Sequence, residues 1–94
     1  MSQIPQKTDV VVIGAGLAGL AAARRLVIAG RQVCVIDASD AVGGRIRTDE
    51  VDGLLLDRGF QLYNPSYSEG LSVLDLKLLD VKSFSPGVIV SIDG

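Results

Sequence analysis

The chain has 94 residues, of which 48% are hydrophobic and 21% charged, and its formal net charge is −2. This composition excludes an intrinsically disordered chain, and the charge provides no basic field that would attract nucleic acid. The sequence contains no histidine and only one cysteine, Cys34, so it lacks the commonest general base, internal disulfides and Cys-x-x-Cys pairs. We therefore expect at most one domain, without a metal site, in a reducing compartment such as the cytoplasm.

The first predicted elements are a flexible tail over residues 1–8 and a strand over Val10–Ile13, a run of four β-branched residues. A run without polar alternation is typical of a central parallel strand covered on both faces. The uncharged stretch from Val10 to Ala23 falls short of the roughly 20 residues that a transmembrane helix needs. Lys7 before this stretch is compatible with a signal peptide, but Asp9 and three regularly spaced glycines favour a folded element.

A helical pattern follows the strand, because apolar residues recur at spacings of three and four between Leu17 and Ala29. Gly30 is placed to end this helix in the left-handed conformation that glycine adopts most easily. Val33–Ile36 is a second apolar run, in which Cys34 is expected to be a small buried residue. The order of strand, glycine turn, helix and strand predicts a βαβ crossover.

The segments Arg47–Glu50 and Leu54–Asp57 flank Val51-Asp52-Gly53 and predict a short hairpin, since Asp-Gly is a strong turn signal. A short helix is expected to begin at Pro65 and Ser66.

In that helix Ser66 and Glu69 have the spacing of a capping box. The last predicted strand is Val88–Ile92, which ends at Asp93-Gly94, a turn dipeptide without a return strand after it.

The segment from Gly14 to Gly19 fits the pattern Gly-x-Gly-x-x-Gly between a predicted strand and a predicted helix. Gly14 makes the tight turn, Gly16 lets the backbone approach a pyrophosphate, and Gly19 lets helix and strand pack closely. The anion would bind at the helix N-terminus, beside the backbone of Leu17 and Ala18.

Asp37 ends the second strand 18 residues after Gly19, close to the spacing of about 20 expected for a carboxylate that accepts hydrogen bonds from ribose. Its charge would also repel the 2′-phosphate of NADP. These residues alone leave three interpretations open, namely an NAD site, an FAD site and a glycine-rich βαβ unit that binds nothing.

The run from Asp37-Ala38 to Gly43-Gly44-Arg45 resembles the flavoprotein family of amine oxidases, phytoene desaturases, protoporphyrinogen oxidase and renalase. That family carries an acid-Ala-x-x-x-x-Gly-Gly-Arg run after its second strand, and the resemblance extends from about Asp9 to Tyr63. It implies FAD as the cofactor, with Gly44 folding back over the pyrophosphate and Arg45 donating hydrogen bonds to it. The alternative for Arg45 is a solvated loop residue.

The resemblance continues over Leu56–Gln61, where a hydrophobic-Asp-x-Gly stretch of the family brings backbone close to the flavin ring. It implies that Gly59, Phe60 and Gln61 contact the cofactor, although Phe60 and Gln61 could equally belong to a core or loop. Asp57 is expected to order this loop. The sequence departs from the family at Asp37, where glutamate is usual. It also offers no match for the lysine that amine-oxidising members place near the flavin, so no catalytic residue is assigned.

The predicted fold class is α/β, a Rossmann-like FAD/NAD(P)-binding βαβ unit that is incomplete and followed by short hairpins. We expect residues 9–94 to be the N-terminal part of an FAD-binding domain that needs the remainder of its own chain and is inactive alone. The resemblance implies an FAD-dependent oxidoreductase that takes a hydride from a C–H bond of a small-molecule amine or carbon chain onto flavin N5.

Two other functions remain open. An NAD-dependent dehydrogenase is disfavoured by Gly43-Gly44-Arg45, and a non-catalytic protein like the Rab escort and GDP-dissociation inhibitor proteins is disfavoured by the three glycines and Asp37. A disulfide reductase is excluded because the segment lacks the cysteine pair that such an enzyme needs.

Overall fold

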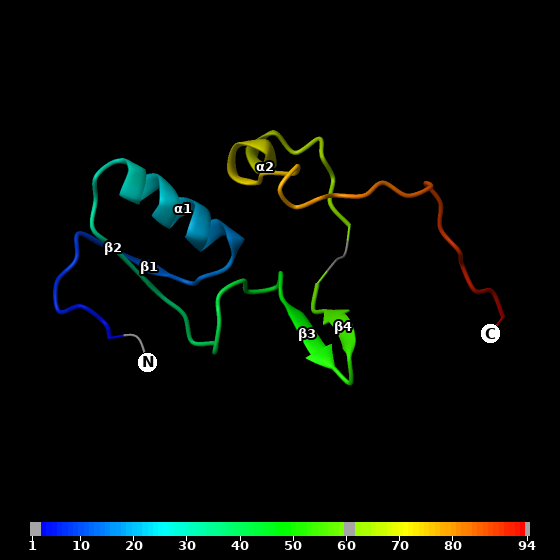
Figure 1. Ribbon diagram of the computed structural model, residues 1–94, viewed down its shortest axis with the longest axis horizontal. Helices are drawn as coiled ribbons and strands as arrows, with labels where there is room; N and C mark the ends of the chain where they lie inside the picture. The colour runs from blue at the N-terminus through cyan, green and yellow to red at the C-terminus, as the bar shows by residue number, and fades with distance from the viewer. Residues whose placement is uncertain (1–2, 60–61, 94) are drawn as a thin grey trace. The chain divides into compact units, whose positions relative to one another are not determined.

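The computed structural model describes residues 3–59 and 62–93, which form two compact units divided after residue 63. The first unit holds most of the regular structure (Figure 1). Within the described residues, the elements in chain order are β1 (Val10–Ile13), α1 (Leu17–Ile28), β2 (Val33–Ile36), β3 (Thr48–Val51), β4 (Leu54–Asp57) and α2 (Ser68–Val73). The mixed α/β class predicted from the sequence is confirmed.

Strands β1 and β2 pair in parallel, from Val10 opposite Val33 to Ile13 opposite Ile36, and α1 connects them. The helix ends as its sequence predicts. Gly30 has φ 82°, and its N–H donates to Val27 O at 3.0 Å, while the N–H of Arg31 donates to Leu26 O at 3.0 Å. This pair of bonds is a Schellman motif, which satisfies carbonyls that the helix leaves open.

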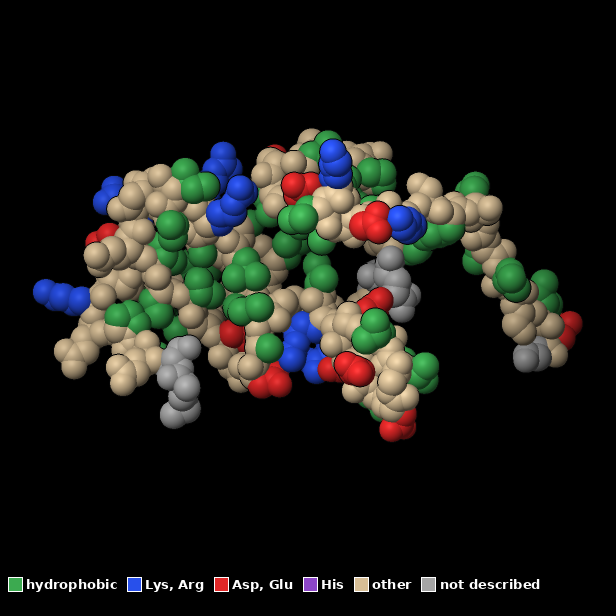
Figure 2. Space-filling view, viewed as in Figure 1, with side chains coloured by type: hydrophobic (Ala, Val, Ile, Leu, Met, Phe, Trp, Pro, Cys, Tyr) green, Lys and Arg blue, Asp and Glu red, His purple; other side chains and the backbone are tan. Residues whose placement is uncertain are grey.

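The expectation that β1 and β2 are covered on both faces is wrong for the described residues. Val11 is 54% and Ile13 84% exposed, and the buried hydrophobic residues among those described are Ala15 and Ala23. Cys34 is half-buried rather than buried. The reason is that α1 packs along one face of the strand pair (Figure 1), and one helix leaves the other face open. Figure 2 accordingly shows many hydrophobic side chains at the surface.

Strands β3 and β4 form the predicted antiparallel hairpin, with Thr48 opposite Asp57 and Val51 opposite Leu54. Asp52 and Gly53 have φ angles of 51° and 78°, the left-handed pair of a type I′ turn. The hydroxyl of Thr48 donates to a carboxylate oxygen of Asp57 across the strands. Asp57 therefore links the two strands of the hairpin, and its predicted role in ordering the Leu56–Gln61 loop stays a prediction.

The second unit differs from the prediction at its helix. Helix α2 begins at Ser68, and its N-cap residue, Tyr67, makes no side-chain capping bond. The predicted capping box of Ser66 and Glu69 is wrong, because the side chain of Asn64 accepts the Ser66 N–H at 2.9 Å. That Asx-type bond holds Ser66 in a turn before the helix.

The predicted strand at Val88–Ile92 is also wrong, since no strand follows α2 within the described residues. Ile89 is fully exposed. A β-branched run favours extended backbone, but it becomes a strand only when a partner accepts and donates its hydrogen bonds. Asp93 has φ 60°, and Gly94 lies outside the described residues. Across the described part of the chain, no helix is long and apolar enough to cross a membrane.

Candidate functional site

The glycine turn between β1 and α1 needs glycine for two different reasons. Gly14 has φ 103°, a conformation that other residues rarely adopt, and its N–H donates to Ile36 O at 2.7 Å. At Gly19 the reason is space, because a Cβ there would lie 1.8 Å from Gly14 O and 3.4 Å from Val12 Cγ1. The close packing of helix against turn and strand that the sequence predicts is therefore present.

The second glycine segment, Gly43-Gly44, folds back against the first. Gly43 pairs with Gly16 in an isolated parallel bridge, and the Gly43 N–H donates to Ala15 O at 2.8 Å. A Cβ on Gly44 would lie 3.1 Å from Gly16 Cα. The two segments, 27 residues apart in sequence, thus meet backbone against backbone.

Asp37 holds the glycine turn from the end of β2. Its Oδ2 accepts the Ala15 N–H at 2.7 Å, and its Oδ1 accepts the N–H of Ser39 at 2.8 Å and the Ser39 hydroxyl at 2.7 Å. These hydrogen bonds, the one from Ala15 first, lower the pKa of Asp37 from 3.8 to about 2. The carboxylate therefore stays ionised further into the acidic range than an ordinary aspartate does.

Sequence reasoning missed these two partners of Asp37. A local signal for Ser39 was present, because aspartate side chains often accept the backbone N–H of the residue two positions later in an Asx turn. The bond to Ala15 had no local signal. A carboxylate offers about four acceptor positions, so Asp37 keeps capacity for the predicted ribose contact.

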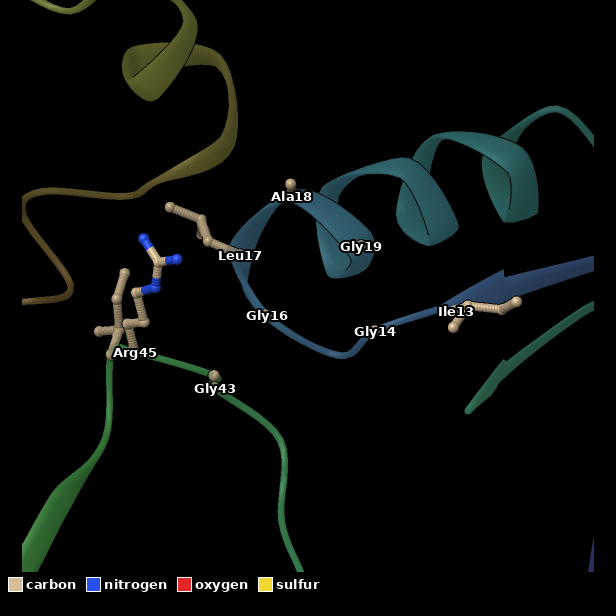
Figure 3. Close-up of a pocket in the computed structure, with 10 residues that line it drawn as sticks. Ile13, Gly14, Gly16, Leu17, Ala18, Gly19, Gly43 and Arg45 are labelled. Carbon is tan, nitrogen blue, oxygen red and sulfur yellow. The ribbon is translucent and has the colours of Figure 1, made fainter. Parts of the chain in front are cut away.

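A pocket opens beside the two glycine segments (Figure 3). It brings together seven predicted cofactor residues, and its lining is Ile13, Gly14, Gly16, Leu17, Ala18, Gly19, Gly43, Gly44, Arg45 and Ile46. The amino end of α1 forms one side of it, and the first turn of α1 contains no acidic residue. Free backbone N–H groups and the positive end of the helix dipole therefore face the pocket, and no acidic side chain of the first turn neutralises them.

A second pocket adjoins the first, since both are lined by Ile13 and Gly14. Its other lining residues are Ile36, Asp37 and Ala38. Asp37, the predicted ribose residue, and Ala38, a predicted cofactor residue, thus lie next to the predicted pyrophosphate residues.

Arg45 extends its side chain toward the first turn of α1, on the side of Leu17 (Figure 3). Arg45 takes part in no ion pair among the described residues. The ion pairs there join Arg47 to Asp40, Arg58 to Asp49 and Lys82 to Asp80. A guanidinium without an acidic partner at a pocket wall is suited to bind an anion.

Gly59 lies against the backbone of Arg45, because a Cβ on Gly59 would stand 2.6 Å from Arg45 O. Within the described residues, Gly59 therefore permits a close approach to the Arg45 carbonyl. The predicted flavin contact of Gly59 stays a prediction, and Phe60 and Gln61 lie outside the described residues.

The residues present fit a dinucleotide better than a metal ion. The part of the chain that the structure describes holds no cluster of three His, Cys, Asp or Glu side chains that could bind a metal. By contrast, Gly16 and Gly44 line a pocket beside a helix N-terminus and Arg45, which are the groups that a pyrophosphate site requires.

A family model described as flavin containing amine oxidoreductase matches residues 17–89. The chain belongs to this family. The resemblance on which FAD was predicted is thereby confirmed, and so is the flavin cofactor.

Individual relatives agree with this assignment. Putrescine oxidase of Kocuria rosea is 50% identical over 74 residues, which are 79% of this chain and 16% of that protein. Human all-trans-retinol 13,14-reductase is 47% identical over 58 residues, covering 62% of this chain and 10% of that protein. A solved structure of putrescine oxidase with bound putrescine matches with a TM-score of 0.67 at 45% identity, over 82% of this chain and 17% of that one. The chain thus spans about a sixth or less of the length of these relatives.

Proposed function

We propose that the glycine turn and the Gly43–Arg45 loop bind the pyrophosphate of FAD in the Rossmann-like part of a flavin-dependent oxidoreductase. The observation that carries this proposal is the backbone contact between Gly16 and Gly44 at the amino end of α1. Backbone N–H groups of the helix N-terminus would donate hydrogen bonds to the two phosphates. The helix dipole would place about half a positive charge beside them. Arg45, at the same pocket, would add charged hydrogen bonds.

The ribose of the cofactor is proposed to lie in the adjoining pocket, at Asp37 and Ala38. Asp37 is charged at neutral pH, so its carboxylate can accept ribose hydroxyl groups and repels a 2′-phosphate, and the hydrogen bonds from Ala15 and Ser39 fix its position. This charge favours FAD or NAD over NADP, and the family favours FAD.

For the whole protein we propose oxidation of a small-molecule amine. Bound FAD would supply the redox chemistry by accepting a hydride from a substrate C–H bond at N5. The residues of this chain would orient the cofactor and fix its phosphates. The similarity to putrescine oxidase supports an amine, while the similarity to a retinol reductase supports a carbon chain as a second candidate.

The test is the visible absorption spectrum of the full-length protein, with the released cofactor identified after heating. We expect stoichiometric FAD in the natural protein and none in Gly16→Val, because the valine side chain would occupy the space that the pyrophosphate needs. Circular dichroism of the variant shows that the loss of flavin is not a loss of the fold. Gly53→Asn is the matched control, since its hairpin turn lies outside the pocket lining and asparagine tolerates a positive φ. A Gly16→Val protein with full flavin content would refute this assignment of the site, and bound NAD would refute the cofactor.

Oxygen consumption with putrescine as a representative diamine tests the amine class. Anaerobic reoxidation of the chemically reduced flavin by retinol tests the carbon-chain class, because a reductase passes electrons to its substrate. Turnover of the amine alone supports the proposal. Reoxidation by retinol alone would replace it with the second candidate.

A further inference from the structure

Arg47 stands out because it is a charged side chain with only 15% of its surface exposed. It immediately precedes β3 and lies two residues after Arg45. Its Nη1 donates to Asp40 Oδ1 at 2.8 Å, while Asp40 itself is 84% exposed. Partial removal of a charged side chain from water costs desolvation free energy, so its position calls for compensating contacts.

The aliphatic part of Arg47 covers the second glycine segment. A Cβ on Gly43 would lie 2.8 Å from Arg47 Cγ and 3.6 Å from Arg47 Cδ. Gly43 is the residue whose N–H donates to Ala15 O and which forms the bridge with Gly16. The stem of Arg47 therefore packs on the segment that lines the proposed pyrophosphate pocket.

The backbone of Arg47 also joins this segment to the hairpin, because its carbonyl accepts the N–H of Arg58 at 2.8 Å. Its charge acts on nearby carboxylates. The hydrogen bond from Arg47 is the main cause that lowers the pKa of Asp40, and the Arg47 charge adds to the lowering at Asp37 after the hydrogen bonds from Ala15 and Ser39.

The two arginines of this loop thus differ in their surroundings. Arg45 stands at the pocket without an acidic partner among the described residues, whereas Arg47 is paired and packed behind Gly43. We propose that Arg47 is a positioning residue, which through Asp40 and Gly43 holds the Gly43–Arg45 loop against the glycine turn in the conformation that binds the cofactor. This inference rests on the proposed FAD site.

The test is FAD affinity in the full-length protein, measured by titrating the apoprotein, together with the thermal midpoint of each apoprotein. Arg47→Met keeps a stem over Gly43 but removes the charge, and Asp40→Asn removes the partner charge. We expect each to weaken FAD binding about threefold to fivefold, the range for an ion pair with one exposed partner. Because the pair acts as one unit, the double variant should be no weaker than the singles.

Arg47→Lys provides the rescue, since one ammonium can replace the single bond to Asp40, and it should restore affinity to within about 1.5-fold of the natural protein. Arg58→Met is the matched control, because it removes an ion pair at 2.7 Å that does not contact Gly43. Its effect on FAD affinity should be smaller than that of Arg47→Met.

Natural affinity in Arg47→Met, additive losses in the double variant, or an equal loss in Arg58→Met would each overturn the positioning role while leaving the FAD site intact. A natural protein that binds no FAD would instead refute the proposed function itself.

Discussion

Asp37 and Ala15 join the end of β2 to the centre of the glycine turn, through a hydrogen bond of 2.7 Å from the Ala15 N–H to Asp37 Oδ2. The carbonyl of Ala15 accepts the N–H of Gly43 on its other side, and Ala15 is only 3% exposed. One buried residue, Ala15, therefore links β2, the glycine turn and the second glycine segment. This arrangement makes Asp37 part of the support of the site as well as a candidate ribose ligand.

The first prediction concerns the pH dependence that Asp37 confers. Its folded pKa of about 2 lies below the ordinary 3.8, so its contribution to stability is present above about pH 4 and is lost as the pH falls toward 2. Asp37→Asn should lower the thermal midpoint at neutral pH, because the amide turns a donor toward Ala15 or Ser39. The midpoint difference should shrink as the pH falls below about 4. A difference that stays constant with pH would contradict this account.

The second prediction separates two glycines of the same turn. Gly19→Ala should destabilise the apoprotein by about 1–3 kcal/mol in urea unfolding, because the new Cβ would collide with Gly14 O. Gly16→Ala places its Cβ 3.9 Å from Gly44 Cα, an ordinary contact, so stability should be retained while FAD binding weakens. Equal losses of stability in the two variants would contradict the prediction, because they would show that the Gly19 collision costs no more than the ordinary contact at Gly16.

The third prediction concerns Arg45. Arg45→Ala should weaken FAD binding by about 1.5–3 kcal/mol, the range for a charged hydrogen bond, when apoprotein is titrated with FAD. Its thermal midpoint as apoprotein should change little, because no ion pair of the described residues is lost. An unaltered dissociation constant would leave Arg45 as the solvated loop residue of the alternative interpretation.

The fourth prediction is that residues 1–94 alone show no oxidoreductase turnover. The buried hydrophobic residues among those described are two alanines, whereas large side chains such as Val11 and Ile13 are exposed. Apolar burial of this extent stabilises little, and the edges of the β1–β2 pair favour association. Assaying this segment beside a carboxy-terminally extended chain for bound flavin and oxygen-dependent turnover tests it. Stoichiometric FAD and steady turnover from the short form would refute the expectation.

The elements that could be predicted from the sequence are those decided within a few residues. The apolar runs Val10–Ile13 and Val33–Ile36 form strands at the predicted bounds, and Gly30 ends α1 with a left-handed φ. Asp52-Gly53 makes the expected turn. In each case the cause is local, namely a steric preference of the backbone or a periodic apolar pattern, which a sequence displays directly.

Other features depend on groups far apart in the chain, and only the tertiary structure decided them. Val88–Ile92 has a strand-forming composition but no partner among the described residues, because hydrogen bonds between strands need a second strand. The burial of Arg47 depends on Asp40 and Gly43, which no periodic pattern connects to it. The contact of Gly16 with Gly44 likewise appears only when the loop folds back, since spacing along a chain does not specify how two loops meet.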